Sequence, residues 1–382
     1  MTVVTYYGGR IFDGTRLHEA SALRLRDGVV EAFGSEAALR AEGGVDQGTW
    51  AYLDGAILSP GFVDLQLNGG DGVMLNDAPS ASVLARMVAA HRRLGATHIL
   101  PTLITAAPAR TTAAINAVKE ALAAGQTGIL GLHLEGPHLS VPRKGAHDAA
   151  LIRPMTDADL AELIAAARDL PALMVTVAPE NVCPDQVAAL AEAGVVVALG
   201  HTDAPYEQCC DYFAAGARCA THLFNAMSQL GSRAPGLVGA ALDTEHVHVG
   251  IIADGVHVHP TSLRLAWRLK GAGKLVLVSD AMAPAGTDMA AFALDGRQIL
   301  REAGRLTRAD GTLAGADLDL LRAVEVMHHQ VGVTLAAALA AATSVPADLI
   351  GATGAGRLQV GQRAEVIRIT PDLRAVTVLA TV

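Results

Sequence analysis

The sequence predicts an α/β protein built from a (β/α)₈ barrel and a small β-sandwich domain to which both termini contribute. Three observations predict it. Between residues 59 and 345, short apolar stretches alternate with helical patterns, which is typical of a barrel. The two ends instead carry closely spaced strand patterns separated by glycine turns. The 382 residues are also enough for one large domain of ~250 residues plus a smaller one.

The terminal segments have the pattern of antiparallel strands. The N-terminal part alternates TVVTYY, SALRLR and GVVEAFG with turn residues, and the stretch AEVIRITPDLRAVTVLATV from Ala364 has the same character. Neither end holds enough strands for an independent sheet. We therefore expect residues 1–58 and 346–382 to form the small domain, and residues 59–345 to form the barrel.

Eight apolar stretches between the two ends are candidate barrel strands. They are residues 61–67, 97–102, 128–134, 172–178, 194–200, 217–222, 247–253 and 274–280. Their richness in Ile and Val, with little alternation, favours a parallel sheet that is buried on both faces. The clearest helix follows Thr156, which forms a capping-box pattern with Asp159. His91, near the end of another helical stretch, is expected to be a solvated cation of the last turn.

Composition and charge exclude several classes of protein. A net charge of −9 without a basic run argues against nucleic-acid binding, although a local site for an anionic substrate stays open. No apolar run reaches the ~18 residues of a membrane span, and the N-terminus lacks the pattern of a signal peptide. The four cysteines lack zinc-knuckle spacing and read as buried thiols of a cytoplasmic protein, with a regulatory role of Cys209 and Cys210 left open.

Polar residues interrupt the apolar pattern at the ends of four predicted strands. These residues are Glu135, His201, His222 and Asp280. Each could separately be a turn former or a helix cap. In a barrel, however, the carboxyl ends of the strands meet on one face, where active sites are built. One Glu and two His also match a set of catalytic zinc ligands that leaves a fourth position for water. The sequence therefore predicts a metal-dependent active site.

Several longer motifs carry a resemblance to a known family. They are PGFVDLQLNG (60–69), HLEGPHL (133–139), LGHTDA (199–204), THLFNAM (221–227), IIADGVHV (251–258) and VSDAMAPAG (278–286). In this order they resemble the N-acetylglucosamine-6-phosphate deacetylase family of the amidohydrolase superfamily. The resemblance covers nearly the whole chain. It implies a metal-dependent barrel, a β-sandwich made from both termini, and a homodimer.

The resemblance also implies roles for individual residues. Glu135, His201 and His222 would bind one divalent metal ion per subunit, most readily zinc, with iron, manganese or cobalt possible. Asp280 would be the catalytic acid and base, and His147 would reach the acetyl carbonyl. The implied substrate-binding residues are Gln66, His147, Asn225, Ala226, Arg233 and His257. Among them Asn225, the backbone of Ala226 and His257 would hold the phosphate, and Arg233 would reach a phosphate bound in the neighbouring subunit.

One position departs from the pattern of many amidohydrolases, which carry His-x-His at the end of the first strand for a second metal. Here the position reads Gln66-Leu67-Asn68. Neutral amides are poor substitutes for imidazole ligands, so the sequence resembles the single-metal branch of the family. The role of His138, which follows the Gly-Pro turn, is left open.

The expected reaction is hydrolysis of the acetamide of N-acetylglucosamine 6-phosphate to glucosamine 6-phosphate and acetate by a metal-activated water. The nearest alternative is a deacetylase of another amino-sugar phosphate, such as N-acetylgalactosamine 6-phosphate. A deaminase or cyclic amidase is a second alternative, which the phosphate-site residues and the missing His-x-His disfavour. A non-catalytic binding protein on the same barrel is a third, which the full set of Glu135, His201, His222 and Asp280 disfavours.

Overall fold

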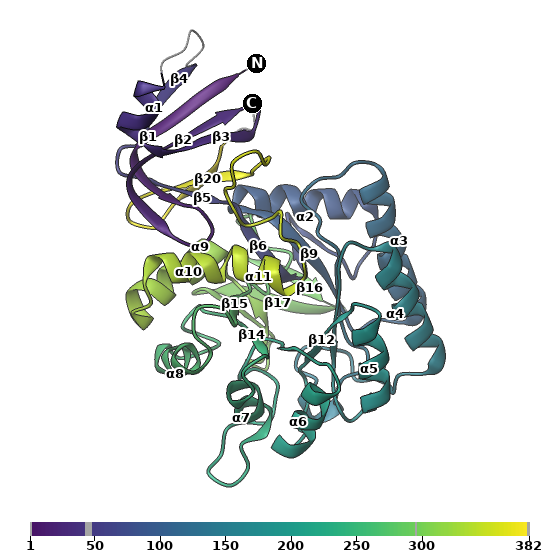
Figure 1. Cartoon of the computed structure of the whole chain (residues 1–382). Coiled ribbons are helices and arrows are strands. Elements are labelled where there is room, and N and C mark those ends of the chain that lie inside the picture. The colour runs from purple at the N-terminus through teal and green to yellow at the C-terminus, as the bar shows by residue number, and fades with distance from the viewer. Residues whose placement is uncertain (1, 43–47, 295, 380–382) are drawn as a thin grey trace.

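The protein is described by a computed structural model that covers residues 2–42, 48–294 and 296–379. Strands from both ends of the chain share one seven-stranded sheet, which lies at the upper left of Figure 1 beside both termini. The strands are β1 (Val3–Phe12), β2 (Leu17–Arg26), β3 (Val29–Ser35), β4 (Thr49–Tyr52), β5 (Ile57–Pro60), β20 (Val366–Ile369) and β21 (Val376–Val378). β5 pairs with β20, which joins the two ends as predicted.

This terminal sheet has a small apolar core of its own. Its buried residues come from both ends of the chain, for example Ile11, Leu23 and Leu58 with Leu358 and Val366. The short helix α1 (Glu36–Ala41) packs against the sheet, and its N-cap Ser35 accepts a hydrogen bond from the backbone of Ala38.

Eight parallel strands form the barrel, in the order β15-β14-β13-β12-β11-β10-β9-β6. They are β6 (Phe62–Leu67), β9 (Ala96–Ile104), β10 (Leu132–Glu135), β11 (Leu173–Val177), β12 (Val196–Leu199), β13 (Cys219–Ala220), β14 (His248–Ile251) and β15 (Leu275–Leu277). Each overlaps one of the eight predicted stretches. Almost every strand residue is buried because helices cover the outside of the barrel. The predicted fold class is confirmed.

Helices connect successive strands, and several of them follow one side of the barrel in Figure 1. They are α2 (Ala81–Arg93), α3 (Pro108–Ala123), α4 (Asp157–Asp169), α5 (Pro184–Glu192), α6 (Tyr206–Ala214), α7 (Gly236–Asp243), α8 (Pro260–Lys270), α9 (Leu320–Glu325), α10 (Leu335–Ala341) and α11 (Ser344–Leu349). A π-helical turn (Val326–Val331) follows α9. Among the described residues, no helix is both long and apolar enough to cross a membrane.

The helix patterns were predicted with mixed success. The capping box of α4 is confirmed, since Thr156 Oγ1 accepts from the Asp159 amide and Asp159 Oδ2 accepts from the Thr156 amide. The expectation for His91 is wrong. Its ring is only 2% exposed, and Nε2–H donates to the Gly69 carbonyl at 2.8 Å. Burial lowers the pKa of His91 to about 4, so the ring is neutral.

An antiparallel sheet that the sequence analysis did not predict lies between β15 and α9. Its strands are β16 (Ala291–Leu294), β17 (Arg297–Glu302), β18 (Arg305–Thr307) and β19 (Leu313–Ala316). A two-residue turn with positive φ at Ala303 and Gly304 joins β17 to β18, as in many tight hairpins. β19 contacts the end of the barrel, where the Ala316 amide donates to the Asp280 carbonyl at 2.9 Å. Two small strands, β7 (Gly69–Gly70) and β8 (Val73–Met74), follow β6.

Candidate active site

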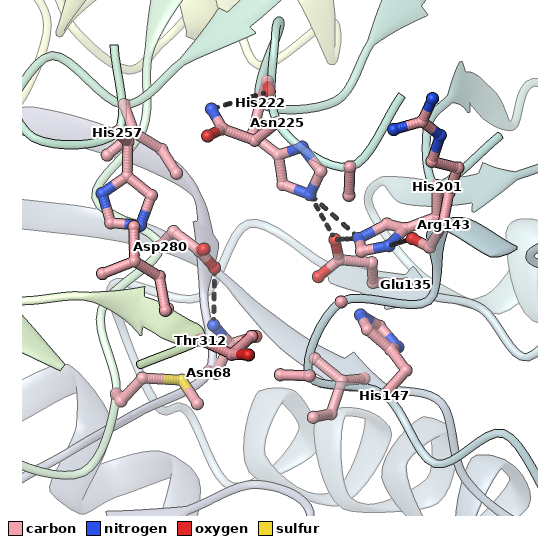
Figure 2. Close-up of a pocket in the computed structure, with 18 of the residues that line it drawn as sticks. Asn68, Glu135, Arg143, His147, His201, His222, Asn225, His257, Asp280 and Thr312 are labelled. Atoms are coloured by element: carbon pink, nitrogen blue, oxygen red, sulfur yellow. Dashed lines mark hydrogen bonds and ion pairs between the residues drawn. The ribbon is translucent and has the colours of Figure 1, made fainter. Parts of the chain in front are cut away.

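The four polar strand ends meet in one cavity of about 520 Å³. Glu135 is the last residue of β10, while His201, His222 and Asp280 follow the ends of β12, β13 and β15 within three residues. Figure 2 shows these side chains pointing toward one another across the cavity. The prediction that the barrel brings them together is confirmed.

Backbone strain directs three of these side chains. His201, His222 and Asp280 have φ values of +48°, +31° and +49°, in a region that residues other than glycine rarely occupy. Such a conformation turns the chain sharply at the end of each strand. Strained residues of this kind cluster at functional sites, where the surrounding structure holds them in place.

Glu135, His201 and His222 converge most closely. Glu135 Oε1 lies 3.0 Å from Nε2 of each histidine, and the two Nε2 atoms are 3.0 Å apart. All three side chains are buried. Atoms that share a tetrahedral zinc ion lie about 3.3 Å from one another. The spacing of these three atoms therefore suits a shared cation.

The tautomer of His201 supports a cation at this point. Its Nδ1 lies 2.9 Å from the backbone carbonyl of Arg143, which can only accept, so Nδ1 carries the proton. In the neutral ring, Nε2 then presents a lone pair to Glu135 Oε1, and two electron-rich atoms face each other at 3.0 Å. A positive charge between them removes this repulsion, and a hydrogen bond from Nδ1 to a carbonyl is the usual support of a metal-binding histidine.

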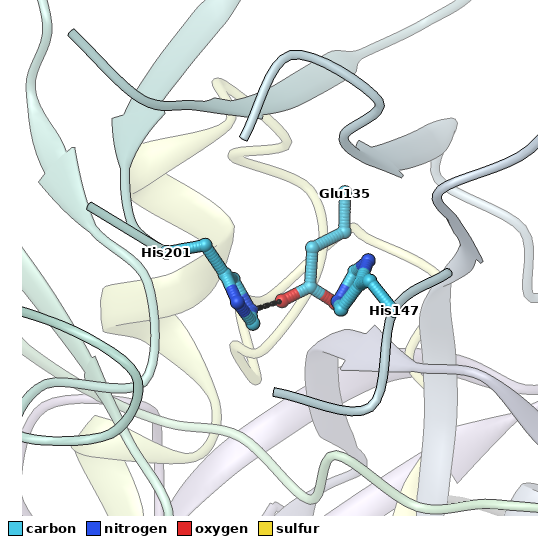
Figure 3. Close-up of side chains that lie close together, drawn as sticks. All are labelled: Glu135, His147 and His201. Atoms are coloured by element: carbon cyan, nitrogen blue, oxygen red, sulfur yellow. Dashed lines mark hydrogen bonds and ion pairs between the residues drawn. The ribbon is translucent and has the colours of Figure 1, made fainter. Parts of the chain in front are cut away.

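His147 also lies beside this cluster, and Figure 3 shows it next to Glu135 and His201. One ligand atom from each of these three residues lies within 4.8 Å of the other two, so a cation could be assigned to this set instead of the set with His222. The hydrogen bonds of His147 argue against that. The Thr105 amide donates to its Nδ1 at 3.3 Å, and the Thr105 hydroxyl lies 2.8 Å from the same atom.

An amide N–H can only donate, so His147 Nδ1 is the acceptor and the neutral ring carries its proton on Nε2. Burial and the neighbouring His201 lower the pKa of His147 to about 3, which keeps the ring neutral. His147 thus offers an N–H group to the cavity, whereas His201 offers a lone pair. We therefore favour Glu135, His201 and His222 as the cation site.

The close contacts within the cluster also shift the pKa values of Glu135 and His222. Burial would raise the pKa of Glu135, but the neighbouring imidazoles of His201 and His222 hold it well below its usual value. Burial also opposes protonation of His222, yet the hydrogen bond and charge of Glu135 raise its pKa. Nδ1 of His222 is buried and has no hydrogen-bond partner among the described residues.

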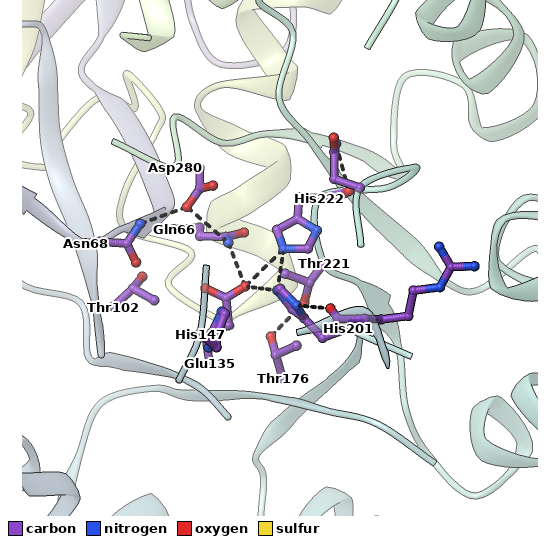
Figure 4. Close-up of polar contacts among 12 residues, drawn as sticks. Gln66, Asn68, Thr102, Glu135, His147, Thr176, His201, Thr221, His222 and Asp280 are labelled. Carbon is purple, nitrogen blue, oxygen red and sulfur yellow. Dashed lines mark hydrogen bonds and ion pairs between the residues drawn. The ribbon is translucent and has the colours of Figure 1, made fainter. Parts of the chain in front are cut away.

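Asp280 lies on the opposite side of the cavity beside two amides. Asn68 Nδ2 donates to its Oδ1 at 2.8 Å, while Gln66 Nε2 lies 3.5 Å from the same oxygen and 3.3 Å from Glu135 Oε1 (Figure 4). These contacts place amide hydrogens between the two carboxylates. Burial raises the pKa of Asp280 to about 6, and the charge of Glu135 adds to this effect.

The other predicted substrate-binding residues are divided between the cavity and the surface. Asn225, Ala226 and His257 line the cavity, and His257 Nδ1 lies 2.6 Å from Asp254 Oδ2. Gln66 is buried beneath the cavity and directed at Glu135 and Asp280. Arg233 does not join them, because it lies on the exposed loop that precedes α7.

Sequence reasoning missed several residues of the cavity wall. Arg143, whose guanidinium pairs with Asp203 at 2.7 Å, lines the cavity and supplies the carbonyl that contacts His201. The loop between β18 and β19 contributes Gly311 and Thr312, the start of β19 contributes Leu313, and Arg308 at the base of the loop donates to the Ala146 carbonyl. The tight turns of residues 303–304 and 310–311 were the available signal for this sheet.

His138, whose role the sequence left open, lies outside the cavity. It is 3% exposed, and Nδ1–H donates to the Arg153 carbonyl at 3.0 Å. The arginine in turn pairs with Asp159 at the start of α4. His138 therefore joins the β10 loop to α4. The expectation that all four cysteines are buried is confirmed for Cys209 and Cys219, whereas Cys210 is partly exposed and Cys183 is exposed.

Comparisons with known proteins agree with this geometry. A model of the Amidohydrolase family matches residues 57–381. An N-acetylgalactosamine-6-phosphate deacetylase of Shewanella sp. (strain ANA-3) is 38% identical over 97% of this chain and 93% of its own length. An N-acetylglucosamine-6-phosphate deacetylase of Haemophilus influenzae is 36% identical over 85% of each chain.

Solved structures with the same arrangement include two N-acetylglucosamine-6-phosphate deacetylases. The enzyme from Pasteurella multocida superimposes with a TM-score of 0.92 at 32% identity, over 99% of this chain and 98% of its own. A mutant from Mycobacterium smegmatis, in complex with N-acetyl-D-glucosamine-6-phosphate, gives 0.90 at 32% identity over 100% and 98%. The fold, the cavity and the match over residues 57–381 agree: the chain belongs to the Amidohydrolase family.

Proposed function

We propose that this protein hydrolyses the acetamide of N-acetylglucosamine 6-phosphate, releasing acetate and glucosamine 6-phosphate. The observation that carries the proposal is the convergence of Glu135 Oε1, His201 Nε2 and His222 Nε2 at 3.0 Å from one another, in a cavity shared with Asp280. Two relatives that are named as deacetylases of amino-sugar 6-phosphates align with 97% and 85% of this chain.

Glu135, His201 and His222 would hold one divalent metal ion per subunit. One carboxylate and two imidazoles suit zinc best, while iron, manganese and cobalt accept the same donors. When bound, such an ion supplies Lewis acidity, which makes water more acidic and an amide carbonyl more electrophilic. The amides of Gln66 and Asn68 donate hydrogen bonds to carboxylates, which favours a single ion.

Asp280 would act as the catalytic base and acid. With a pKa of about 6, its carboxyl is mostly ionised at neutral pH and can accept a proton from the attacking water. The same group, once protonated, can deliver that proton to the nitrogen of the breaking C–N bond. The hydrogen bond from Asn68 holds Asp280 Oδ1, so Oδ2 is the oxygen available for transfer.

His147 would stabilise the negative charge that develops on the acetamide oxygen. Its Nε2 carries the proton because Nδ1 accepts from Thr105, so an N–H group points toward the cavity. A donor fixed in a buried site needs no reorganisation when the charge develops. Its lowered pKa also keeps it from competing with Asp280 for the proton of the water.

The phosphate of the substrate would lie at the other end of the cavity. Asn225, the amide of Ala226 and His257 line that end, and Asp254 orients His257 through Nδ1. The chain would act as a homodimer in which Arg233 crosses to the phosphate bound by the partner subunit. An arginine suits a phosphate through charge-assisted hydrogen bonds. Gln66 would contact the substrate from below.

A second candidate substrate is N-acetylgalactosamine 6-phosphate, which differs at one hydroxyl. The 38% identity to a deacetylase named for that sugar favours it.

We further propose a division into a terminal domain (1–58 and 346–382) and a catalytic barrel (59–345), and a cytoplasmic location.

Acetate release measured side by side tests these assignments. We expect kcat/KM to be highest for N-acetylglucosamine 6-phosphate, lower for its galacto epimer, and lowest for unphosphorylated N-acetylglucosamine. A reversed order of the two phosphates would select the second candidate. Equal rates with and without the phosphate would contradict the proposed substrate class.

A further inference from the structure

The barrel is joined least completely between its first and last strands. β6 and β15 stand at the two ends of the strand order, and in the described part of the chain no ladder of paired residues connects them. A single bridge, Leu67 to Ala281, and a few backbone hydrogen bonds close the gap. The Asp280 amide donates to the Gln66 carbonyl at 2.9 Å, and the Asn68 amide donates to the Ala281 carbonyl at 2.7 Å. We call this junction the β6–β15 seam.

Asp64 contributes a side chain to the same seam. Its Oδ1 accepts hydrogen bonds from the amides of Gln66 and Ser279, each at 3.2 Å. One oxygen atom therefore binds one N–H from each side of the junction. Gln66 lies two residues before Asn68, and Ser279 directly precedes Asp280, so both contacts lie next to the groups that surround the proposed base.

The carboxyl group of Asp64 lies in a buried environment that is energetically unfavourable for it. The side chain is 1% exposed, and its Oδ2 has no hydrogen-bond partner among the described residues. Burial raises the pKa of Asp64 to about 7. An apolar residue of similar size would avoid the cost of burying a poorly satisfied carboxyl group. What such a residue could not supply is an acceptor that spans the seam.

Asp280 depends on the seam for its conformation. Its φ of +49° is strained, and the contacts that hold it come from the other side of the junction or from β19. Its amide donates to Gln66, its carbonyl accepts from Ala316, and its carboxylate accepts from Asn68. Strain of this kind persists only where the surroundings over-determine the conformation. Widening the seam would let the side chain turn away from the cavity.

We propose that Asp64 is a positioning residue for the hydrolysis: by joining the Gln66 and Ser279 amides through one carboxylate oxygen, it closes the β6–β15 seam and sets the direction of Asp280. The kinetic consequence rests on the proposed function. The structural consequence, a closed seam, does not. Asp64 itself lies below the cavity and touches neither substrate nor the proposed metal site.

Two substitutions and a control separate positioning from general stability. Asp64→Asn keeps an oxygen that can accept from both amides, whereas the shorter hydroxyl of Asp64→Ser cannot reach Ser279. Val63→Ala is the control, because it removes buried apolar volume from the adjacent position of β6 and leaves the seam acceptor in place. Acetate release, metal content and backbone hydrogen exchange are measured on each, well below the unfolding temperature.

We expect Asp64→Ser to lower kcat by ~10-fold or more, toward the ~10²-fold that a misplacement of about 1 Å can cause, with KM and metal content little changed. Exchange at residues 278–282 should accelerate in this variant only. Asp64→Asn should stay within a few-fold of wild type, and Val63→Ala should keep its kcat despite lower stability.

Equal kcat in Asp64→Ser and Val63→Ala would overturn the proposal. So would failure of Asp64→Ser to fold beside a fully active Asp64→Asn, because Asp64 would then serve the fold alone. If the wild type releases no acetate, the proposed function fails, and the exchange data alone decide whether Asp64 closes the seam.

Discussion

The candidate active site has two halves that differ in hydrogen-bonding character. The ligand half consists of Glu135, His201 and His222. The seam half consists of Gln66, Asn68 and Asp280. In the ligand half, a fixed tautomer leaves electron pairs facing one another at 3.0 Å, an arrangement that a cation stabilises. In the seam half, amide hydrogens already point at carboxylate oxygens, an arrangement that leaves a carboxylate oxygen free to exchange a proton.

The two halves also differ in how the fold supports them. The ligand half stands on β10, β12 and β13, which continuous parallel pairing holds in register with their neighbours. The seam half stands on β6 and β15, which pair with β9 and β14 but, among the described residues, form no ladder with each other. A single bridge, a few backbone hydrogen bonds and the side chain of Asp64 join these two strands instead. In the proposed mechanism, a continuously paired scaffold would therefore hold the three metal-ligand atoms at fixed distances, while a few separate bonds would hold the group that transfers the proton.

The largest effect that separates the halves is expected for Asp280→Asn. The substitution preserves shape and removes the base, so kcat should fall by ~10² or more while metal content and KM change little. Steady-state kinetics together with elemental analysis measure both properties. Near-normal turnover would make Asp280 a structural residue and would contradict the division of the site into two roles.

Arg233→Ala should produce the next largest effect, on substrate affinity. Loss of a charge-assisted hydrogen bond costs ~1.5–3 kcal/mol, so KM for the phosphorylated substrate should rise by about 10- to 150-fold. Hydrolysis of unphosphorylated N-acetylglucosamine is the control and should change little.

Subunit exchange makes the Arg233 prediction sharper. In a hybrid of an Arg233→Ala chain with an Asp280→Asn chain, one site regains both Asp280 and the partner's Arg233. Mixing the two variants should therefore recover activity that neither parent has. Hybrids that form without such recovery would indicate that Arg233 acts within its own subunit or only steers anions.

Replacing Gln66 and Asn68 together by histidine should convert the seam half into a second ligand half. Imidazole lone pairs would then face Glu135 and Asp280, and the metal content should rise from one ion per chain toward two. Inductively coupled plasma analysis of the double variant and the wild type measures this. A content that stays at one ion would mean that the amides are not what limits the site to a single metal.

The smallest effect is expected for His91, which supports the seam half from α2 and should make the stability of the protein depend on pH. His91 on α2 donates to Gly69, just beyond Asn68, and burial lowers its pKa to about 4 against about 6.5 in an unfolded chain. The unfolded state then binds a proton that the native state does not, so stability falls as the pH drops from about 6.5 toward about 4. In the His91→Gln variant, the decrease in the free energy of unfolding between pH 7 and pH 4.5 should be smaller by up to ~3 kcal/mol. Urea unfolding of the variant and the wild type at both pH values measures this. An unchanged difference between the two pH values would assign the acid sensitivity to other buried histidines.

The features that sequence predicted are those with local or periodic causes. Eight parallel strands were visible because burial on both faces makes each an apolar run. Glu135, His201, His222 and Asp280 were visible because they end such runs, and the barrel geometry places all strand ends together. The capping box of Thr156 is equally local. Motif resemblance added residues such as Asn225 and His257 that no periodicity singles out.

The features that sequence could not predict depend on contacts between distant segments. His91 was wrongly expected to be solvated because the carbonyl that binds it belongs to Gly69, 22 residues earlier. The opposite tautomers of His147 and His201 are set by Thr105 and Arg143, which lie 42 and 58 residues away. The sheet formed by β16–β19 was missed because its strands are short, and because charged residues interrupt the apolar pattern of β17 and β18.

We propose that one cation binds in the ligand half and that His147 and the seam half lie outside its donor set. Anomalous diffraction from crystals of the metal-loaded protein would locate this cation. We expect one anomalous peak per chain, next to Glu135 Oε1, His201 Nε2 and His222 Nε2. A peak coordinated by His147 in place of His222, or a second peak against Gln66, Asn68 or Asp280, would contradict it.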